Sequence, residues 1–415
     1  MAGMEAEMKP SPLLPVPVLL LTAALSFAQP PASPVPDEAA LTQGNNAFAV
    51  DLYGQLRAQS GNLFFSPASI STAFAMAYAG AGGQTATEMA GVFHFTLPPD
   101  QLHPAMGALL AAMNANHTGY QLRVADALWA QQDASFLPSY LNLVRSDYGA
   151  GFHRVDYKAS PETVRATINQ WVEQQTNNKI QNLILQGVLS TSTRLVLTNA
   201  IYFKGDWLNT FQKSATQDEE FYLSATQTVK APMMHRTGGY YYYDGGTFQE
   251  LELPYKGDEL SMVVLLPKDI GGLPALEESF TSASLADWQQ KLEPASKVIL
   301  TFPRFTMTKQ IELSGTLAKM GMAQAFSGAA DFSAMTGKHD FFISAVIHKA
   351  FVDVSEQGTE AAAATATVMT ATAMRSQVPE PPPIVFRADH PFLFLIRDMQ
   401  SGSILFMGRV ADPTK

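Results

Sequence analysis

The run EQGTEAAAATATVMTATA (356–373) constrains the fold of this chain more than any other stretch. Its residues are mostly small, so it has too little apolar bulk to nucleate a core of its own. Thr and Val nevertheless favour strands over free coil. No proline occurs between Gly358 and Val378, so no donor of a β-ladder is missing from this stretch. The run is therefore either a flexible linker or a strand that a sheet can accept.

Alternate residues of a strand face opposite sides, so strand alternation places Glu360, the one charged residue of 359–373, away from the core. The set that would face the core is Thr359, Ala361, Ala363 and Thr365. The set that would face away from the core is Glu360, Ala362 and Ala364. Gly358 gives the backbone conformational freedom where the run begins. This pattern favours an insertable strand over a linker.

The apolar content is sufficient for a large core, since 47% of the 415 residues are hydrophobic. The net charge is −10, and no Lys or Arg lies between Arg57 and Arg123. Because phosphate binding relies on clustered Lys and Arg, we do not expect nucleic acid as a partner. The lack of cysteine excludes disulfides and thiolate metal sites.

Motifs of the common enzyme classes are missing from the sequence, including G-x-S-x-G, H-E-x-x-H, the Walker motif and the dinucleotide glycine pattern. The eight histidines are scattered, and none lies at metal-ligand spacing. His94 and His103 are expected at the surface. We therefore predict a protein that is not an enzyme and that needs no metal or cofactor.

Residues 1–28 have the features of a secretory signal peptide. The apolar stretch LLPVPVLLLTAALSFA (13–28) ends with Ser26 and Ala28 in a small-x-small pattern. Translation could start at Met1 or at Met8, and the second start would give a basic N-terminus. Residues 29–40 are rich in proline and are expected to form an extended linker. We expect a secreted, extracellular protein, or a periplasmic one if the source is bacterial.

Residues 41–415 are predicted to form one α+β domain, because helical patterns come mostly first and strand patterns mostly later. Predicted helices include 40–58, 84–91, 99–113, 137–148 and 160–184, where Pro161 would be the first helical residue. Predicted strands include 120–131, 194–205, 262–267, 392–398 and 403–410.

Five segments of the sequence closely resemble the serpin family. They are NLFFSPASIS (62–71), INQWVEQQTNNKI (168–180), LVLTNAIYFKGDW (195–207), ISAVIHKAFVDVSEQGTEAAAAT (343–365) and ADHPFLFLIRD (388–398). The resemblance covers almost all of residues 40–413. It implies a serpin fold with about nine helices, three β-sheets and an exposed reactive loop over about 356–384.

The resemblance implies a suicide inhibitor of serine proteases. The loop presents a scissile bond, and the nucleophile of the protease attacks it and forms an acyl-enzyme. The cut loop then enters the main sheet and deforms the protease before deacylation. The expected product is a covalent 1:1 complex with a monomeric inhibitor. The alternative is a non-inhibitory serpin that acts as a carrier, storage or chaperone-like binding protein. The hinge of such a protein would often carry a charged or bulky residue or a proline, whereas the core-facing positions of this hinge are all small.

The resemblance also assigns residues to the mechanism. The hinge of the loop comprises Glu356, Gly358, Thr359, Glu360, Ala361, Ala362, Ala363, Ala364 and Thr365. The shutter, a polar cluster beneath the opening strands, comprises Ser66, Ser69, Asn199 and His348. The breach, where insertion begins, comprises Trp207, Arg304 and Glu356. In a plainer interpretation, the shutter residues are buried polar residues whose hydrogen bonds are satisfied. The Glu356–Arg304 pair of the breach would then be an ordinary surface ion pair.

The family's usual interval from the hinge places the scissile bond at Thr372–Ala373. Small residues there suit elastase-like or subtilisin-like proteases. Met374–Arg375 and Arg375–Ser376 stay open as alternatives, and Arg375 would suit a trypsin-like protease. Some serpins bind heparin on the helix that corresponds to 99–113, but this segment has no Lys or Arg. We therefore expect no heparin site there.

Overall fold

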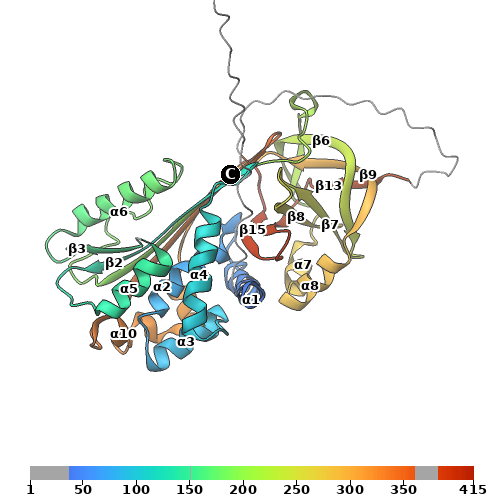
Figure 1. Ribbon diagram of the computed structural model, residues 1–415. Coiled ribbons are helices and arrows are strands. Elements are labelled where there is room, and N and C mark those ends of the chain that lie inside the picture. The colour runs from blue at the N-terminus through green and yellow to red at the C-terminus, as the bar shows by residue number, and fades with distance from the viewer. Residues whose placement is uncertain (1–36, 150, 360–381) are drawn as a thin grey trace, which may run out of the picture. The chain divides into compact units, whose positions relative to one another are not determined.

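The computed structural model describes residues 37–149, 151–359 and 382–415 (Figure 1). The predicted signal peptide and most of the predicted linker lie outside the described residues. So do the hinge residues from Glu360 onward and every candidate for the scissile bond. Helix α1 begins at Glu38, within the stretch assigned to the linker.

Ten α-helices form within the described residues, in agreement with the α+β class. Helices α4, α5 and α6 begin with proline, whose fixed φ suits the first helical position. Helix α2 also begins with Pro67, and the Ser66 side chain caps it by accepting from the Ser69 N–H. The helices are α1 (Glu38–Leu56), α2 (Pro67–Tyr78), α3 (Gly83–Phe93), α4 (Pro99–Met113), α5 (Pro138–Tyr148), α6 (Pro161–Gln175), α7 (Leu273–Ser279), α8 (Ser282–Gln290), α9 (Ser314–Leu317) and α10 (Ser333–Thr336).

A six-stranded sheet has the order β10-β11-β12-β4-β2-β3. Its strands are β10 (Phe305–Glu312), β11 (Ile343–Ser355), β12 (Gly358–Thr359), β4 (Leu195–Asp206), β2 (Tyr120–Gln131) and β3 (Phe152–Val155). Strand β12 is so short that β11 and β4 pair directly with each other over most of their length. This pairing is parallel, whereas β4 and β2 pair antiparallel.

The remaining strands form one continuous nine-stranded sheet, where the sequence predicted two further sheets. The 18-residue strand β6 joins the two parts, because it pairs with β9 through Met233–Tyr242 and with β7 through Tyr241–Asp244. The strands are β1 (Leu63–Phe65), β5 (Gln217–Ser224), β6 (Gln227–Asp244), β7 (Phe248–Pro254), β8 (Leu260–Pro267), β9 (Glu293–Pro303), β13 (Ile384–Arg387), β14 (Phe392–Asp398) and β15 (Ile404–Val410).

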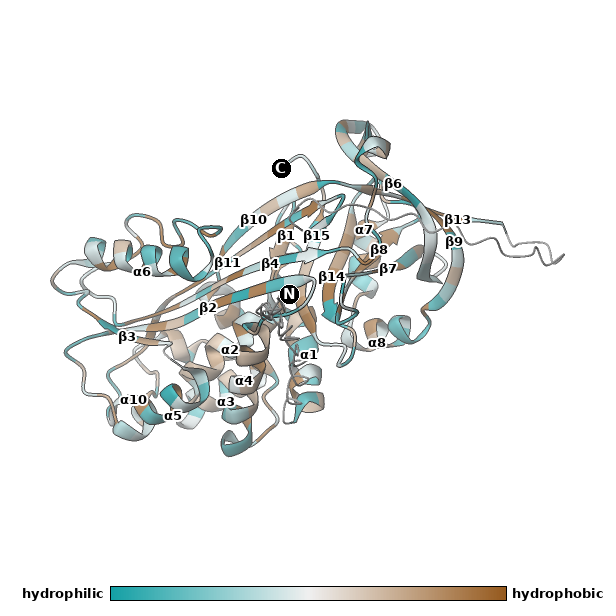
Figure 2. Cartoon of the chain, turned by 45° about the horizontal axis from the view of Figure 1, so that its top comes forward, coloured by the Kyte–Doolittle hydropathy of each residue, from teal (hydrophilic) through white to brown (hydrophobic). Residues whose placement is uncertain are grey.

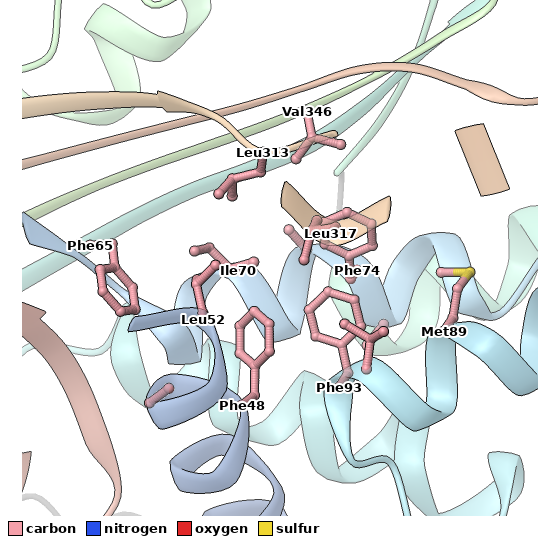
Figure 3. Packing of buried hydrophobic residues seen from close by; sticks show 14 of the residues in the cluster. Phe48, Leu52, Phe65, Ile70, Phe74, Met89, Phe93, Leu313, Leu317 and Val346 are labelled. Atoms are coloured by element: carbon pink, nitrogen blue, oxygen red, sulfur yellow. The ribbon is translucent and has the colours of Figure 1, made fainter. Parts of the chain in front are cut away.

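Helices cover both faces of the six-stranded sheet, with α6 on one face and α2 and α5 on the other (Figure 1). Under α2 the core is rich in aromatic rings, and Phe93 lies 4.6 Å by ring centroid from both Phe48 and Phe74 (Figure 3). Leu317 and Val346 close this cluster from the side of the sheet. Strand β4 of this sheet is buried at every residue from Leu195 to Phe203, whereas α5 and α6 carry many hydrophilic residues (Figure 2). The sheet is therefore a buried layer between helices.

Two predictions from the sequence are wrong in detail. Helix α6 ends at Gln175 and not near residue 184, because Asn177 and Asn178 adopt left-handed φ angles of 51° and 60°. His103 is buried, since α4 turns it toward α5, where its Nδ1 lies 2.8 Å from the Tyr148 hydroxyl. His94 is partly exposed, and its ring pairs with Asp51. Among the described residues, no helix is long and apolar enough to cross a membrane.

Candidate functional site

The site centres on the seam between β4 and β11, which we define as the parallel pairing of Leu195–Tyr202 with Ile343–Phe351. Both strands belong to the segments that carry the family resemblance. The seam is closed along this length by direct pairing of the two backbones. The predicted insertion of the loop requires these two strands to separate.

At one end of the seam, β12 already lies between β4 and β11. Thr359 pairs with Val354 of β11 and with Gly205 of β4, and both pairings are antiparallel. Gly358 pairs in the same way with Ser355 and Asp206. The loop therefore leaves β11, turns through two residues and starts a strand between the two that must part.

Only glycine fits at position 358. Its φ is +147°, a conformation that residues with a side chain rarely adopt. A Cβ on this residue would also lie 2.0 Å from the Gly205 carbonyl oxygen. The predicted conformational freedom of Gly358 is thus used for a close backbone approach to β4.

The predicted breach residues come together at this same end of the seam. The Trp207 indole N–H donates to the Ser355 carbonyl at 2.9 Å, and the Trp207 ring stacks on Tyr255 at 4.6 Å. The backbone N–H of Trp207 donates to the Gln357 carbonyl at 2.7 Å. These bonds fix the turn that leads from β11 into β12.

Glu356 is buried at this turn, but its main partner is one that the sequence analysis missed. The Thr216 hydroxyl donates to Glu356 Oε1 at 2.8 Å. Arg304 Nη1 lies 3.8 Å from the same oxygen, and the Arg304 side chain is 52% exposed. An ion pair this long, with its arginine half exposed to water, contributes little. Thr216, just before β5, gave no signal in the sequence.

The predicted shutter residues also come together, at the middle of the seam and fully buried. His348 of β11 and Asn199 of β4 are register partners, and their side chains bond through Nδ1 and Oδ1. The Asn199 amide donates to Ser69 Oγ at 2.5 Å. The Ser66 hydroxyl donates to the Leu405 carbonyl at 2.6 Å. One side-chain hydrogen bond therefore crosses the seam at this point.

The proton on His348 can be assigned from its neighbours. Nε2 accepts from the Ser66 backbone N–H at 3.2 Å, so in the neutral ring Nδ1 carries the hydrogen and donates to Asn199 Oδ1. Burial lowers the pKa of His348 to about 3. His348 is therefore neutral at physiological pH, with this tautomer fixed.

A carboxyl group that sequence reasoning missed completes the cluster. Asp126 of β2 is the register partner of Asn199 and accepts from its amide. It also accepts from the Thr72 hydroxyl at 2.8 Å and the Ser69 hydroxyl at 3.3 Å. The available signal was a lone acidic residue in the otherwise apolar stretch VADALWA (124–130). We call Ser66, Ser69, Thr72, Asp126, Asn199 and His348 the polar cluster.

The chain returns from the loop through β13, which pairs in parallel with β9. Arg387 at its end forms ion pairs with Glu219 and Asp389, each at 2.6 Å. These contacts fix the far end of the loop. Among the described residues, no group of three or more His, Asp or Glu side chains could hold a metal ion.

Comparisons with known proteins identify the family. The family model for serpins, described as serine protease inhibitors, matches residues 43–413. The leukocyte elastase inhibitor of Homo sapiens is 41% identical over 383 residues, which cover 90% of this chain and 99% of that protein. A serpin-like protein of Thermococcus kodakarensis is 40% identical over 89% of this chain and 84% of its own length.

Solved structures agree with these matches. Uncleaved ovalbumin superposes with a TM-score of 0.81 at 28% identity, covering 90% of this chain and all of that one. Human thyroxine-binding globulin bound to thyroxine also gives a TM-score of 0.81, at 31% identity over 91% of this chain and 100% of that one. These findings confirm the serpin fold expected from the sequence motifs. The chain belongs to the serpin family of serine protease inhibitors.

Proposed function

We propose that this protein inhibits a serine protease as a suicide substrate. The protease cuts the loop and becomes attached to it as an acyl-enzyme. The cut loop then extends β12 along the seam and carries the protease with it, so that the ester is trapped. The observation that carries this proposal is the position of β12, which begins a strand between the two strands that the mechanism must separate.

The register of β12 predicts where each following residue would lie. Thr359 is opposite Gly205 and Val354. Thr365 lies six residues beyond Thr359. Both pairings are antiparallel, so an inserted Thr365 would lie opposite the residues six positions before Gly205 and Val354, which are Asn199 and His348. Residues opposite one another in a sheet have side chains on the same face. Thr365 would therefore enter the polar cluster.

A hydroxyl at this position can replace the hydrogen bond that insertion breaks. His348 Nδ1–H would donate to the Thr365 oxygen, and the Thr365 hydroxyl would donate to Asn199 Oδ1. The one hydrogen bond that is broken when the strands part is then replaced by two. The hydrogen-bonding groups of the cluster can thus be satisfied both when the seam is closed and when the loop is inserted. Apolar residues at positions 199 and 348 would favour only the closed seam.

We infer that the target is an elastase-like or subtilisin-like protease. Thr372 and Ala373 are small residues that suit shallow specificity pockets. The similarity to a protein named leukocyte elastase inhibitor supports the same class. Arg375 keeps a trypsin-like target as the second candidate.

The test is incubation of the secreted or expressed full chain with pancreatic elastase, subtilisin and trypsin separately. We expect a complex with elastase or subtilisin that survives boiling in detergent, and a released peptide that begins at Ala373 by mass spectrometry. A peptide that begins at Ser376, formed with trypsin and not with elastase, would move the reactive bond to Arg375. Cleavage by all three enzymes without any stable complex would instead favour a non-inhibitory binding protein.

A further inference from the structure

The polar cluster contains a buried carboxyl group, and the proposed mechanism gives it no role so far. Asp126 is 6% exposed, and its side-chain partners, Thr72, Ser69 and Asn199, are all uncharged. A buried carboxylate normally requires a cation or shifts its pKa. Here burial raises the pKa of Asp126 to about 7, although the hydrogen bonds from Thr72, Asn199 and Ser69 act in the opposite direction.

The titratable groups around Asp126 do not compensate its charge. His348 of β11 reaches it only through Asn199 and stays neutral. On β2, β4 and β11, the basic residues Arg123, Lys204 and Lys349 are an odd number of positions from Asp126, Asn199 and His348, so they face the opposite side of the sheet.

The remaining histidines near β2 are occupied elsewhere. His153 of β3 stacks on Trp129, which is an odd number of positions from Asp126 and packs with the α6 side of the sheet. His103 of α4 is bonded to Tyr148. Helix α2 presents only the hydroxyls of Ser69 and Thr72 to Asp126. Ionisation of Asp126 therefore adds an uncompensated charge beneath the seam.

A chain of hydrogen bonds runs through the cluster, in which each residue donates to the next and the Asp126 carboxyl group is the final acceptor. The Ser66 N–H donates to His348, His348 donates to Asn199, and the Asn199 amide donates to Asp126. Asp126 thus holds the Asn199 amide with its oxygen toward His348. A protonated Asp126 can keep the bond from Asn199 and donate its own hydrogen to a hydroxyl of Ser69 or Thr72. Both protonation states fit this geometry.

We propose that Asp126 is the positioning residue of the shutter, and that its ionisation sets how readily β4 and β11 separate. The inference rests on the proposed insertion mechanism and adds its regulation by pH. Separation of the strands breaks the Asn199–His348 bond and admits water toward the cluster. Water solvates a carboxylate far better than a neutral acid. The ionised form therefore favours the open seam, and the protonated form favours the closed one.

The sign of the pH effect follows from this linkage. The closed protein holds the proton of Asp126 up to about pH 7, whereas the pKa of a fully solvated aspartate is 3.8. Protonation of Asp126 stabilises the closed state. This stabilisation is complete below the pKa of a solvated aspartate and is lost as the pH rises through about 7, the pKa of Asp126 in the closed protein. If the pKa of Asp126 is one unit lower in the open state than in the closed state, insertion should be about tenfold faster at high pH than at low pH, and each further unit adds another factor of about ten.

The experiment measures seam opening without a protease. A synthetic peptide with the sequence of residues 359–372 is added to the uncut full chain from about pH 5.5 to about pH 8.5. The rate of annealing is followed by native electrophoresis. For the wild type we expect a rate that rises with pH around neutrality. Asp126→Asn keeps the acceptor for Asn199 and cannot ionise, so its rate should be low and independent of pH.

Two further variants make the test specific. Asp133→Asn removes an exposed carboxylate that pairs with Lys158, outside the cluster, and should keep the wild-type profile. Thr72→Val removes a hydrogen bond that lowers the pKa of Asp126, so its profile should move to higher pH. A purely structural role of Asp126 would not shift the pH profile in this way. The Thr72→Val variant therefore tests the inference even if Asp126→Asn does not fold.

A flat wild-type profile, or an Asp126→Asn profile equal to that of the wild type, would overturn the inference while leaving insertion intact. A peptide that fails to anneal to any variant at any pH, together with no gain in thermal stability after loop cleavage, would overturn both the insertion mechanism and this inference.

Discussion

The seam between β4 and β11 is held differently at its end and at its middle. Near Gly205 and Val354, the backbone of β12 already separates the two strands. Near Asn199 and His348, the strands pair directly, and a buried side-chain bond crosses between them. The difference indicates that strand insertion has a prepared starting point and a defined first obstacle. The loop has to pass the polar cluster before it can extend further.

The largest effect is expected from Thr359→Arg, which blocks insertion at its starting point. In the uncut protein, residue 359 already lies between the two strands, opposite Val354, which is fully buried. An unpaired guanidinium there costs several kcal/mol. Acylation should continue while insertion slows, so the variant should be cleaved as a substrate and leave active protease, measured as the stoichiometry of inhibition.

Glu360→Arg is the matched control for this variant. It places the same side chain on the face that points away from the core, where the wild type already carries a charge. Inhibition should then be close to that of the wild type. Equal inhibition by both variants would show that the strand alternation assigned to the hinge is wrong.

A smaller effect is expected when the bond across the middle of the seam is removed. Asn199→Ala leaves the buried His348 Nδ1 without its partner and removes one of the three donors to Asp126, which costs about 1–3 kcal/mol. We expect lower stability of the uncut protein in urea and faster annealing of the loop peptide. The control is Thr198→Ala on the same strand, whose hydroxyl bonds Trp129 and Ala127 instead. If Thr198→Ala accelerates annealing as much, the crossing bond has no special role.

Gly358→Ala tests the prepared starting point directly. The new Cβ would collide with the Gly205 carbonyl, and the left-handed backbone adds strain of about 1–3 kcal/mol. We expect β12 to leave its place between the strands, which hydrogen exchange at Thr359 and Gly205 would report. Gly402→Ala is the control, since its φ is also positive, at 76°, but nothing lies within 4 Å. Unchanged exchange in Gly358→Ala would contradict the role of the close approach.

The last pair of variants concerns Glu356 beside the starting point. Arg304→Ala should change the free energy of unfolding by at most about 1 kcal/mol, because the pair is long and the Arg304 side chain is half exposed. Thr216→Ala removes a 2.8 Å bond to a buried carboxyl group and should cost more, about 1.5–3 kcal/mol. Urea denaturation compares the two variants. A larger loss of unfolding free energy in Arg304→Ala than in Thr216→Ala would show that Arg304 is the main partner of Glu356.

Sequence reasoning was strongest where motifs carried the information. Ser66 and Ser69 lie far from Asn199 and His348 in the chain, and no local pattern could place the four residues in contact. The family resemblance grouped them, and the structure brings them together. Asp126 was missed because a single acidic residue in a strand can be an exposed one, and only the packing of α2 on β2 shows that it is buried.

The other misses have local causes. His103 lies on the same helical stripe as Met106 and Gly107, and this stripe is buried against α5. The apolar pattern of α6 continues beyond its end, because the side chain of Asn169 bonds the backbone of Ile184 and folds the following segment back onto the helix. Periodicity alone could not separate this segment from a longer helix.

The most direct test of the account is thermal unfolding before and after a single cut in the loop. The cut is made by a protease that does not form a complex, and its position is verified by mass spectrometry. If the cut loop extends β12 along the seam, the six-stranded sheet gains a full central strand, and the melting temperature should rise sharply. An unchanged melting temperature after a verified cut between Thr365 and Ser376 would show that the seam does not accept the loop, and the inhibitory mechanism proposed here would be wrong.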